Sequence, residues 1–217
     1  MAGVWRVAAG LRVNHLPAAL LRPARVGLLL AGLAPAIAFA QDWQALNVTK
    51  PYAISGRTGA ELYASIGQRG PEIKGGQRVI AHTNFKLTWT RDYRNRDGAC
   101  VLAAARPKLT ITYVLPKPSV RLSADVAASW ERFIMGLRAH ERRHGEMIED
   151  LVRQIEAASI GLTMAGDPDC RKIRVELTRR LAALSAAHQQ RNRDFDRAEL
   201  ADGGNVHQLI LSLVNGP

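Results

Sequence analysis

The sequence has few cysteines, a deficit of acidic residues and no long apolar run. Only two of its 217 residues are cysteines, and they form no C-x-x-C pair. No apolar run reaches the roughly 18 residues typical of a membrane-spanning helix, and no repeat of solenoid period is present. Hydrophobic residues make up 47% and charged residues 23%, which excludes a disordered chain. The length suits one domain with a substantial core.

Residues 1–40 contain four arginines and no acidic residue, and they predict a secretory signal peptide. Arg22 and Arg25 precede a short apolar stretch, which ends in small residues at Ala40, as signal peptidase requires. An uncleaved anchor is the alternative, although the apolar stretch is short for a bilayer. We expect export to the periplasm or beyond after cleavage near Ala40-Gln41, with no stable membrane span remaining.

The positive charge does not by itself indicate a nucleic-acid partner. Without the four arginines of the signal, 26 basic residues stand against 19 acidic ones, a net charge of +7. The arginines are spread over both halves and do not alternate with aromatic residues, as a single-strand binder would require. This pattern favours a solvated basic surface, and we expect no nucleic-acid binding.

The two cysteines agree with export. In an oxidising compartment Cys100 and Cys170 are expected to pair, which would close a long loop. Two buried free thiols are the alternative. A catalytic thiol is disfavoured because no histidine pattern accompanies either residue.

Strand patterns precede Pro116-Lys117-Pro118 and helical patterns follow it. Period-two alternation and β-branched residues predict strands, while Thr58 with Glu61 three residues later predicts a capped short helix. The predicted strands are 52–54, 78–81, 85–90, 100–102 and 109–115.

Two long helices are expected after the prolines. The first begins near Ser123 and the second near Cys170, and each carries apolar residues at helical spacing. The turn over 164–169 should bring them side by side. The predicted fold class is therefore α+β: a small antiparallel sheet with a short helix, then two long antiparallel helices.

The first long helix contains an H-E-x-x-H motif, His140-Glu141-Arg142-Arg143-His144. Residues four apart share one face of a helix, so both imidazoles can bind one Zn²⁺. The glutamate lies beside the metal, where it can accept a proton from bound water. Both histidines continue the apolar stripe that contains Leu137. The alternative is a pair of inward histidines bonded to carboxylates or backbone carbonyls.

A catalytic zinc usually has a third protein ligand, and the sequence does not identify it. Glu146 and Glu149 are expected to turn away from the two histidines. His82 in the strand region is an outside candidate. The other candidates follow Leu184 in the second long helix and beyond it: His188, Asp196, Glu199, Asp202 and His207.

In these features the chain resembles a bacterial family of unknown function described as predicted secreted zinc-dependent proteases. The resemblance covers about residues 50–203. The pieces that carry it are Tyr52 to Gly56, Glu61-Leu62, Gly70-Pro71, Ala81-His82-Thr83, Trp89, Cys100, Tyr113-Val114-Leu115-Pro116, Trp130-Glu131-Arg132-Phe133, the H-E-x-x-H motif, Cys170 and Phe195-Asp196.

The resemblance implies an exported protein with one disulfide and a zinc-peptidase motif. In one place the chain departs from the family, where a Thr-x-His-Gly segment usually follows the aromatic-Asp pair. Glu199 stands in the place of the threonine and Ala201 in that of the histidine, and a one-residue slip makes Asp202 the expected third ligand. The domains expected are a signal peptide (1–40), a zinc-protease-like domain (41–203) and a divergent tail (204–217).

The leading hypothesis is an exported zinc metallohydrolase, a peptidase acting on peptides or proteins. His140, His144 and Asp202 would bind Zn²⁺, and Glu141 would be the general base. The alternative is a non-catalytic cell-envelope protein that binds a partner or a polyanion and keeps the motif for structure. A further possibility is a relative that binds metal but does not hydrolyse.

Overall fold

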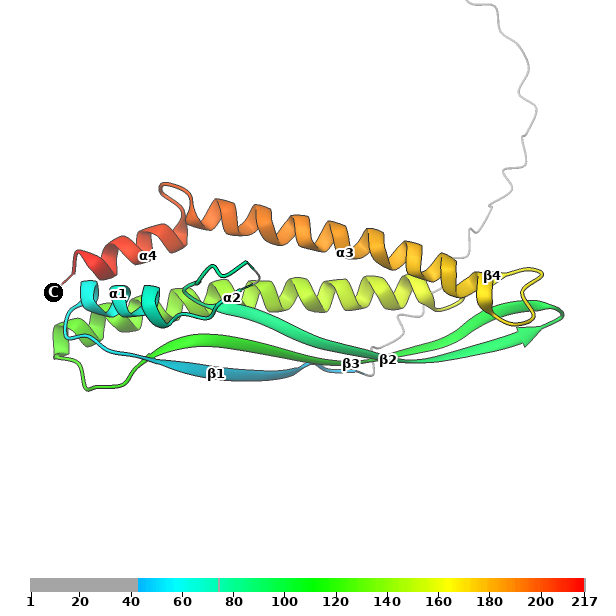
Figure 1. The fold of residues 1–217 in the computed structure, drawn as a ribbon, viewed down its shortest axis with the longest axis horizontal. Helices are drawn as coiled ribbons and strands as arrows, with labels where there is room; N and C mark the ends of the chain where they lie inside the picture. The colour runs from blue at the N-terminus through cyan, green and yellow to red at the C-terminus, as the bar shows by residue number, and fades with distance from the viewer. Residues whose placement is uncertain (1–42, 74, 217) are drawn as a thin grey trace, which may run out of the picture. The chain divides into compact units, whose positions relative to one another are not determined.

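The structure is a computed structural model that describes residues 43–73 and 75–216. The predicted signal peptide lies outside the described residues. The elements follow the order β1, α1, β2, β3, α2, β4, α3 and α4 (Figure 1). A small sheet with one short helix precedes the long helices, so the predicted α+β fold class is confirmed.

The sheet is mixed, whereas an antiparallel one was predicted. β2 (His82–Arg96) and β3 (Ala99–Pro118) form an antiparallel hairpin, but β1 (Leu46–Ile54) pairs parallel to β3 on its other side. A two-residue strand, β4 (Thr163–Met164), pairs with the start of β3. An alternating pattern predicts a strand but not its partner, and α1 lies between β1 and β2 in the sequence.

β3 continues through Pro107, where the sequence predicted a break between two strands. Proline cannot donate a ladder hydrogen bond and is therefore confined to positions with a free side. β1 pairs with β3 only from Thr110 onward, so among the described strands β2 is the single neighbour of β3 at Pro107. The hairpin turns at Asp97 and Gly98, which both have positive φ, as a two-residue turn requires.

The helices agree with the sequence pattern, apart from one addition. α1 (Gly59–Arg69) starts at Thr58, whose hydroxyl accepts a hydrogen bond from the backbone N–H of Glu61. α2 (Ala124–Ser159) and α3 (Arg171–Leu200) lie antiparallel, as predicted (Figure 1). None of the helices in the described ranges is long and apolar enough to cross a membrane.

The segment after residue 203, expected to be a divergent tail, contains a fourth helix. α4 (Asn205–Val214) buries Val206 and Leu213, and the Leu209 side chain lies against Gly136 of α2. These three residues have the i, i+3, i+7 spacing of an amphipathic helix. The family resemblance ended before this segment, and its own periodicity was the signal for the helix.

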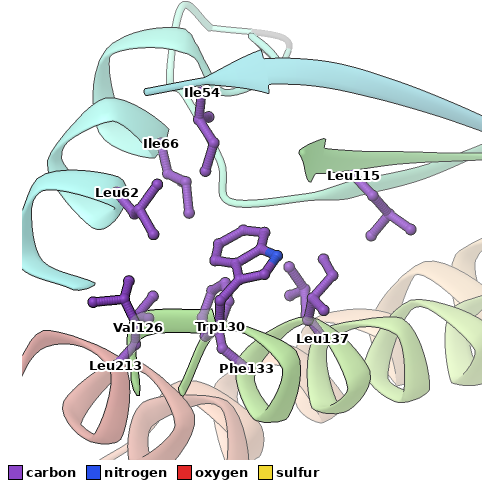
Figure 2. Close-up of a cluster of buried hydrophobic side chains, with 10 residues drawn as sticks. Ile54, Leu62, Ile66, Leu115, Val126, Trp130, Phe133, Leu137 and Leu213 are labelled. Carbon is purple, nitrogen blue, oxygen red and sulfur yellow. The ribbon is translucent and has the colours of Figure 1, made fainter. Parts of the chain in front are cut away.

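Two apolar clusters hold α2, and a third holds the start of α3. At its start, Trp130 and Phe133 meet side chains of β1, α1 and α4 (Figure 2). In its second half, Ile148 and Val152 pack on Leu109 and Ile111 of β3. The third cluster joins β3 to the start of α3 and contains the disulfide between Cys100 and Cys170, which confirms the predicted pair. The H-E-x-x-H motif lies between the first two clusters.

Candidate metal centre

The two motif histidines lie on one face of α2, as their spacing predicts. Leu137, one turn before His140, belongs to the first core cluster, so the motif starts where the packed core ends. The rings of His140 and His144 have centroids 4.8 Å apart, and their Nε2 atoms are 3.1 Å apart. Both side chains are largely withdrawn from solvent, with exposed fractions of 8% and 12%.

α3 brings a carboxylate to the same point. Oδ1 of Asp196 lies 2.8 Å from Nε2 of His144 and 3.3 Å from Nε2 of His140. Three ligand-type atoms from two helices therefore form a triangle. Among the residues that the structure describes, His140, His144 and Asp196 are the group of this kind whose donor atoms lie close enough to share a metal ion.

The triangle fits a tetrahedral zinc site. Zinc–nitrogen and zinc–oxygen bonds of about 2.0–2.1 Å at tetrahedral angles place neighbouring ligand atoms about 3.3 Å apart, and the three edges here are 3.1, 3.3 and 2.8 Å. Two imidazoles and one carboxylate are also a ligand set that zinc accepts. Three electron-rich atoms at this spacing require positive charge between them, either protons or a cation.

Asn192 fixes the orientation of His144. The amide Nδ2 of Asn192 donates to the carbonyl oxygen of His188 at 2.8 Å, which turns its Oδ1 toward His144. Nδ1 of His144 lies 2.6 Å from that oxygen and must be the donor, because a carbonyl oxygen only accepts. In the neutral ring this leaves the lone pair on Nε2, the atom that faces Asp196. A metal-ligating histidine usually has a partner of this kind.

Phe195 and Glu199 surround His140. The Phe195 ring stacks on His140 with centroids 4.8 Å apart, and it meets His144 edge-on at 5.3 Å. Nδ1 of His140 is buried and has no hydrogen-bond partner among the described residues. Its nearest carboxylate oxygen is Oε2 of Glu199, at 3.6 Å. At that distance no hydrogen bond forms, so within the described chain Nδ1 of His140 lacks the kind of contact by which Asn192 orients His144.

Electrostatics couple the histidines to the carboxylate. Burial opposes ionisation of Asp196, but hydrogen bonds from His140 and His144 outweigh it and hold the pKa of this carboxyl well below its usual value. Burial also opposes protonation of His144, but its bonds to Asp196 and Asn192 and the nearby negative charges raise its pKa above the ordinary value. Without a metal ion, the contacts between these side chains therefore favour the ionised form of Asp196 and the protonated form of His144 relative to the isolated groups.

Glu141 is buried and bonded to the sheet. The Thr83 hydroxyl, at the start of β2, donates to Oε2 of Glu141 at 2.5 Å. This contact fixes one carboxylate oxygen and leaves the other for a second partner. Glu141 and both histidines line the same cleft, which has a volume of about 790 Å³.

The cleft joins the polar group to an aliphatic wall. Its lining includes Ile80, Leu137 and Val206 beside His140, Glu141, His144, Asn192 and Asp196. The loop between α1 and β2 forms another side, where Glu72 and Arg78 pair at 3.4 Å. These two charges offset each other, so the uncompensated charge in the cleft is concentrated at the polar group.

Asp202, the predicted third ligand, is not part of the group. It is exposed in the turn between α3 and α4, beyond the end of α3 at Leu200. Asp196 takes its place because it lies within α3 on the face that meets α2. Asp202 was predicted because, with a one-residue slip, it aligns with the histidine of the family's Thr-x-His-Gly segment. That alignment does not take into account which residues of α3 face α2.

The other candidates lie outside the group. Glu146 is exposed and pairs with Arg143 at 2.8 Å, and Glu149 is partly buried and lies 3.7 Å from Arg153; neither belongs to the group of His140, His144 and Asp196. The remaining three are histidines: His82 lines the cleft, His188 is bonded to Asn192, and His207 accepts a hydrogen bond from the Gly203 N–H.

The sequence reasoning missed Asn192 and gave Phe195 no role at the metal centre. A signal for the polar stripe was present, because polar residues recur at helical spacing along α3. His188, Asn192, Asp196 and Glu199 are separated by four, four and three residues, which places them on one face.

Comparisons with known proteins bear on the family and not on the chemistry. A family model described as a bacterial protein of unknown function (DUF922) matches residues 49–204. Comparisons with curated proteins and with solved structures give no significant match.

Proposed function

The chain belongs to this family of bacterial proteins of unknown function, and we propose that it is an exported zinc-dependent hydrolase that cleaves peptides. The observation that carries the proposal is the triangle of His140, His144 and Asp196, with Glu141 on the same cleft. The ligand atoms come from two helices that are far apart in sequence, and their spacing fits a tetrahedral metal ion.

The proposed roles follow from the contacts of each side chain. His140, His144 and Asp196 would hold the ion, and Zn²⁺ would supply the acidity that lowers the pKa of a water at this point. Glu141 accepts a proton from the attacking water and returns it to the leaving amine. The Thr83 hydroxyl fixes one oxygen of that carboxylate, so the proton moves through the other.

Two features of the cleft favour a peptide as the substrate. Ile80, Leu137 and Val206 offer an aliphatic wall beside the polar group. Within the described residues β2 pairs only with β3, so its other edge can take an extended chain by strand pairing. Thr83 links that edge to Glu141. We therefore expect cleavage next to an aliphatic residue.

Export remains part of the proposal. The basic, then apolar segment at residues 1–40 supports it, and so does the disulfide between Cys100 and Cys170, because disulfides persist in oxidising compartments.

A non-catalytic binding protein is the second candidate. Asp196 and His144 lie at hydrogen-bonding distance, so protons can satisfy the polar group without a metal. This alternative predicts a stable fold that binds no zinc.

Metal binding separates the two candidates. The purified protein should bind one Zn²⁺ per chain, measured by elemental analysis after dialysis, and its melting temperature should rise with zinc and fall with a chelator. Free zinc at 100 times its Kd stabilises the native state by about 2.7 kcal/mol. Asp196→Ala should abolish this effect, whereas Asp202→Ala, which removes an exposed carboxylate, should leave it unchanged.

Catalysis is tested with peptides that contain aliphatic residues. Glu141→Gln should keep zinc and lose cleavage, since the amide cannot accept the proton. Cleavage that persists in this variant would contradict the mechanism. A protein that binds no zinc would favour the non-catalytic candidate.

A further inference from the structure

The sheet has one face toward the helices and one that no described element covers. Thr83 of β2 bonds to Glu141, and Leu87 and Trp89 pack with Ile148 of α2. These odd-numbered side chains face the helices. Successive side chains of a strand point to opposite faces, so the even-numbered ones face away. In Figure 1 all four helices lie on the same side of the sheet.

Away from the hairpin turn, the uncovered face carries four basic residues; Arg94 and Arg96 lie nearer the turn and are not part of this set. Lys86 of β2 is opposite Thr110, and on β3 Lys108 and Arg106 are opposite Thr88 and Thr90. On β1, Lys50 is opposite Val114 of β3. We call this surface the basic sheet face; its residues are Leu46, Val48, Lys50, Asn84, Lys86, Thr88, Thr90, Arg106, Lys108, Thr110, Thr112 and Val114.

The charge of this surface is of one sign and is not neutralised. All four basic side chains are exposed, and none of them takes part in a salt bridge within the described chain. None of the residues that define the basic sheet face is an aspartate or a glutamate, and Asp92, the next even-numbered residue of β2, is paired with Arg94 at 2.8 Å. By contrast, many arginines of α2 and α3 pair with acids one turn away, such as Arg153 with Asp150 and Arg197 with Asp194.

The four cations are arranged in rows. Residues two apart on a strand are about 7 Å apart, so Arg106, Lys108 and Lys86 occupy three successive rows and Lys50 lies two rows further. The stripe is therefore about 27 Å long. A small anion can contact one or two of these side chains, whereas a linear polymer with a charge on each unit can contact all four and gains from multivalency.

We propose that the basic sheet face binds a linear acidic polysaccharide. Lys50, Lys86, Arg106 and Lys108 pair with its anionic groups. The threonine hydroxyls and the Asn84 amide between them hydrogen-bond to sugar hydroxyls. The cleft of the candidate metal centre lies on the helix side of the sheet, so this proposal depends on neither metal binding nor hydrolysis.

Other anionic partners fit the surface less well. A single-stranded nucleic acid needs aromatic side chains on which bases stack, and the basic sheet face has none. A lipid surface binds through apolar or aromatic side chains that enter it. On this face the apolar residues (Leu46, Val48 and Val114) lie only at the Lys50 end, away from Arg106 and Lys108.

The test measures binding of fluorescently labelled polygalacturonate, a linear chain of sugar carboxylates, to the purified protein by anisotropy. Lys86→Gln with Lys108→Gln removes two charges from the centre of the stripe. Arg69→Gln with Lys172→Gln is the matched control, because it removes two exposed charges on α1 and α3. Neutral dextran, polyphosphate and vesicles of phosphatidylglycerol are compared as other ligands.

The parent should bind polygalacturonate with an affinity that falls as salt rises, and should not bind dextran. One exposed ion pair contributes about threefold to the affinity, so the sheet variant, which loses two, should bind about tenfold more weakly than the parent. The affinity of the control variant should stay within about twofold of that of the parent. Equal weakening in both variants would show a net-charge effect and overturn the proposal. Absence of binding, or tighter binding to polyphosphate or vesicles, would also overturn it.

Discussion

Removing the disulfide should cost a large part of the stability of the fold. The bond joins Cys100, at the start of β3, to Cys170, just before α3, across 70 residues of sequence that include all of α2. The perturbation is the double variant Cys100→Ala with Cys170→Ala. Both cysteines lie in one apolar cluster, so alanine keeps the site apolar.

The magnitude follows from the length of the closed loop. In the chain-entropy model a cross-link over 70 residues removes about 15 cal/mol/K from the unfolded chain, which is about 4.4 kcal/mol at 25 °C. At roughly 2–4 °C per kcal/mol for a domain of this size, the melting temperature should fall by roughly 9–18 °C. Native domains have a free energy of unfolding of about 5–15 kcal/mol, so the variant should still fold at 25 °C.

Urea unfolding followed by tryptophan fluorescence provides the assay. The variant should unfold at lower urea with a steeper m value, because its unfolded chain exposes more surface without the cross-link. The parent in reductant should behave like the variant, which separates loss of the bond from loss of the two sulfur atoms. A stability loss below about 1 kcal/mol in both samples would refute the reasoning.

Two further predictions concern α2 and α3 near the candidate metal centre. Asn192→Ala should weaken zinc binding about 10–100-fold, because His144 loses the partner that orients it. The control Gln189→Ala, on the exposed side of α3, should leave zinc affinity unchanged. Equal zinc affinities of the two variants, measured by calorimetry, would contradict this prediction. Gly145→Ala would place a Cβ 2.1 Å from the Tyr113 hydroxyl oxygen, costing about 1–3 kcal/mol of overpacking against about 1 kcal/mol of helix propensity gained. Tyr113→Phe should recover most of that cost in a urea-measured double-mutant cycle, and additive effects would disprove the clash.

Local features of the sequence predicted the motif helix and its two histidines. The apolar stripe of α2 and the four-residue spacing of His140 and His144 depend only on the geometry of one helix. The capped start of α1 at Thr58 was predictable for the same reason, because the hydrogen bond joins residues three apart.

Features that depend on contacts between distant segments were not predictable in this way. The third candidate ligand depends on how α3 is rotated against α2, which selects Asp196 and leaves Asp202 in a turn. The parallel pairing of β1 with β3 joins segments about 64 residues apart, and no local pattern distinguishes it from an antiparallel pairing. The polar stripe of α3 can be recognised in the sequence, but its role as part of a metal centre depends on its contact with α2, which no local pattern predicts.

α3 is secured mainly at its ends. The disulfide and the buried Ile173 and Leu177 fix its first turns, and α4 follows its last residue. Between them, α3 has no fully buried side chain, and Asn192 and Asp196 provide polar contacts to α2. A cation bound there would have to order this part of α3 as well as bind its three donor atoms. Its measured affinity would therefore include the free energy of ordering the helix in addition to that of the metal–ligand bonds.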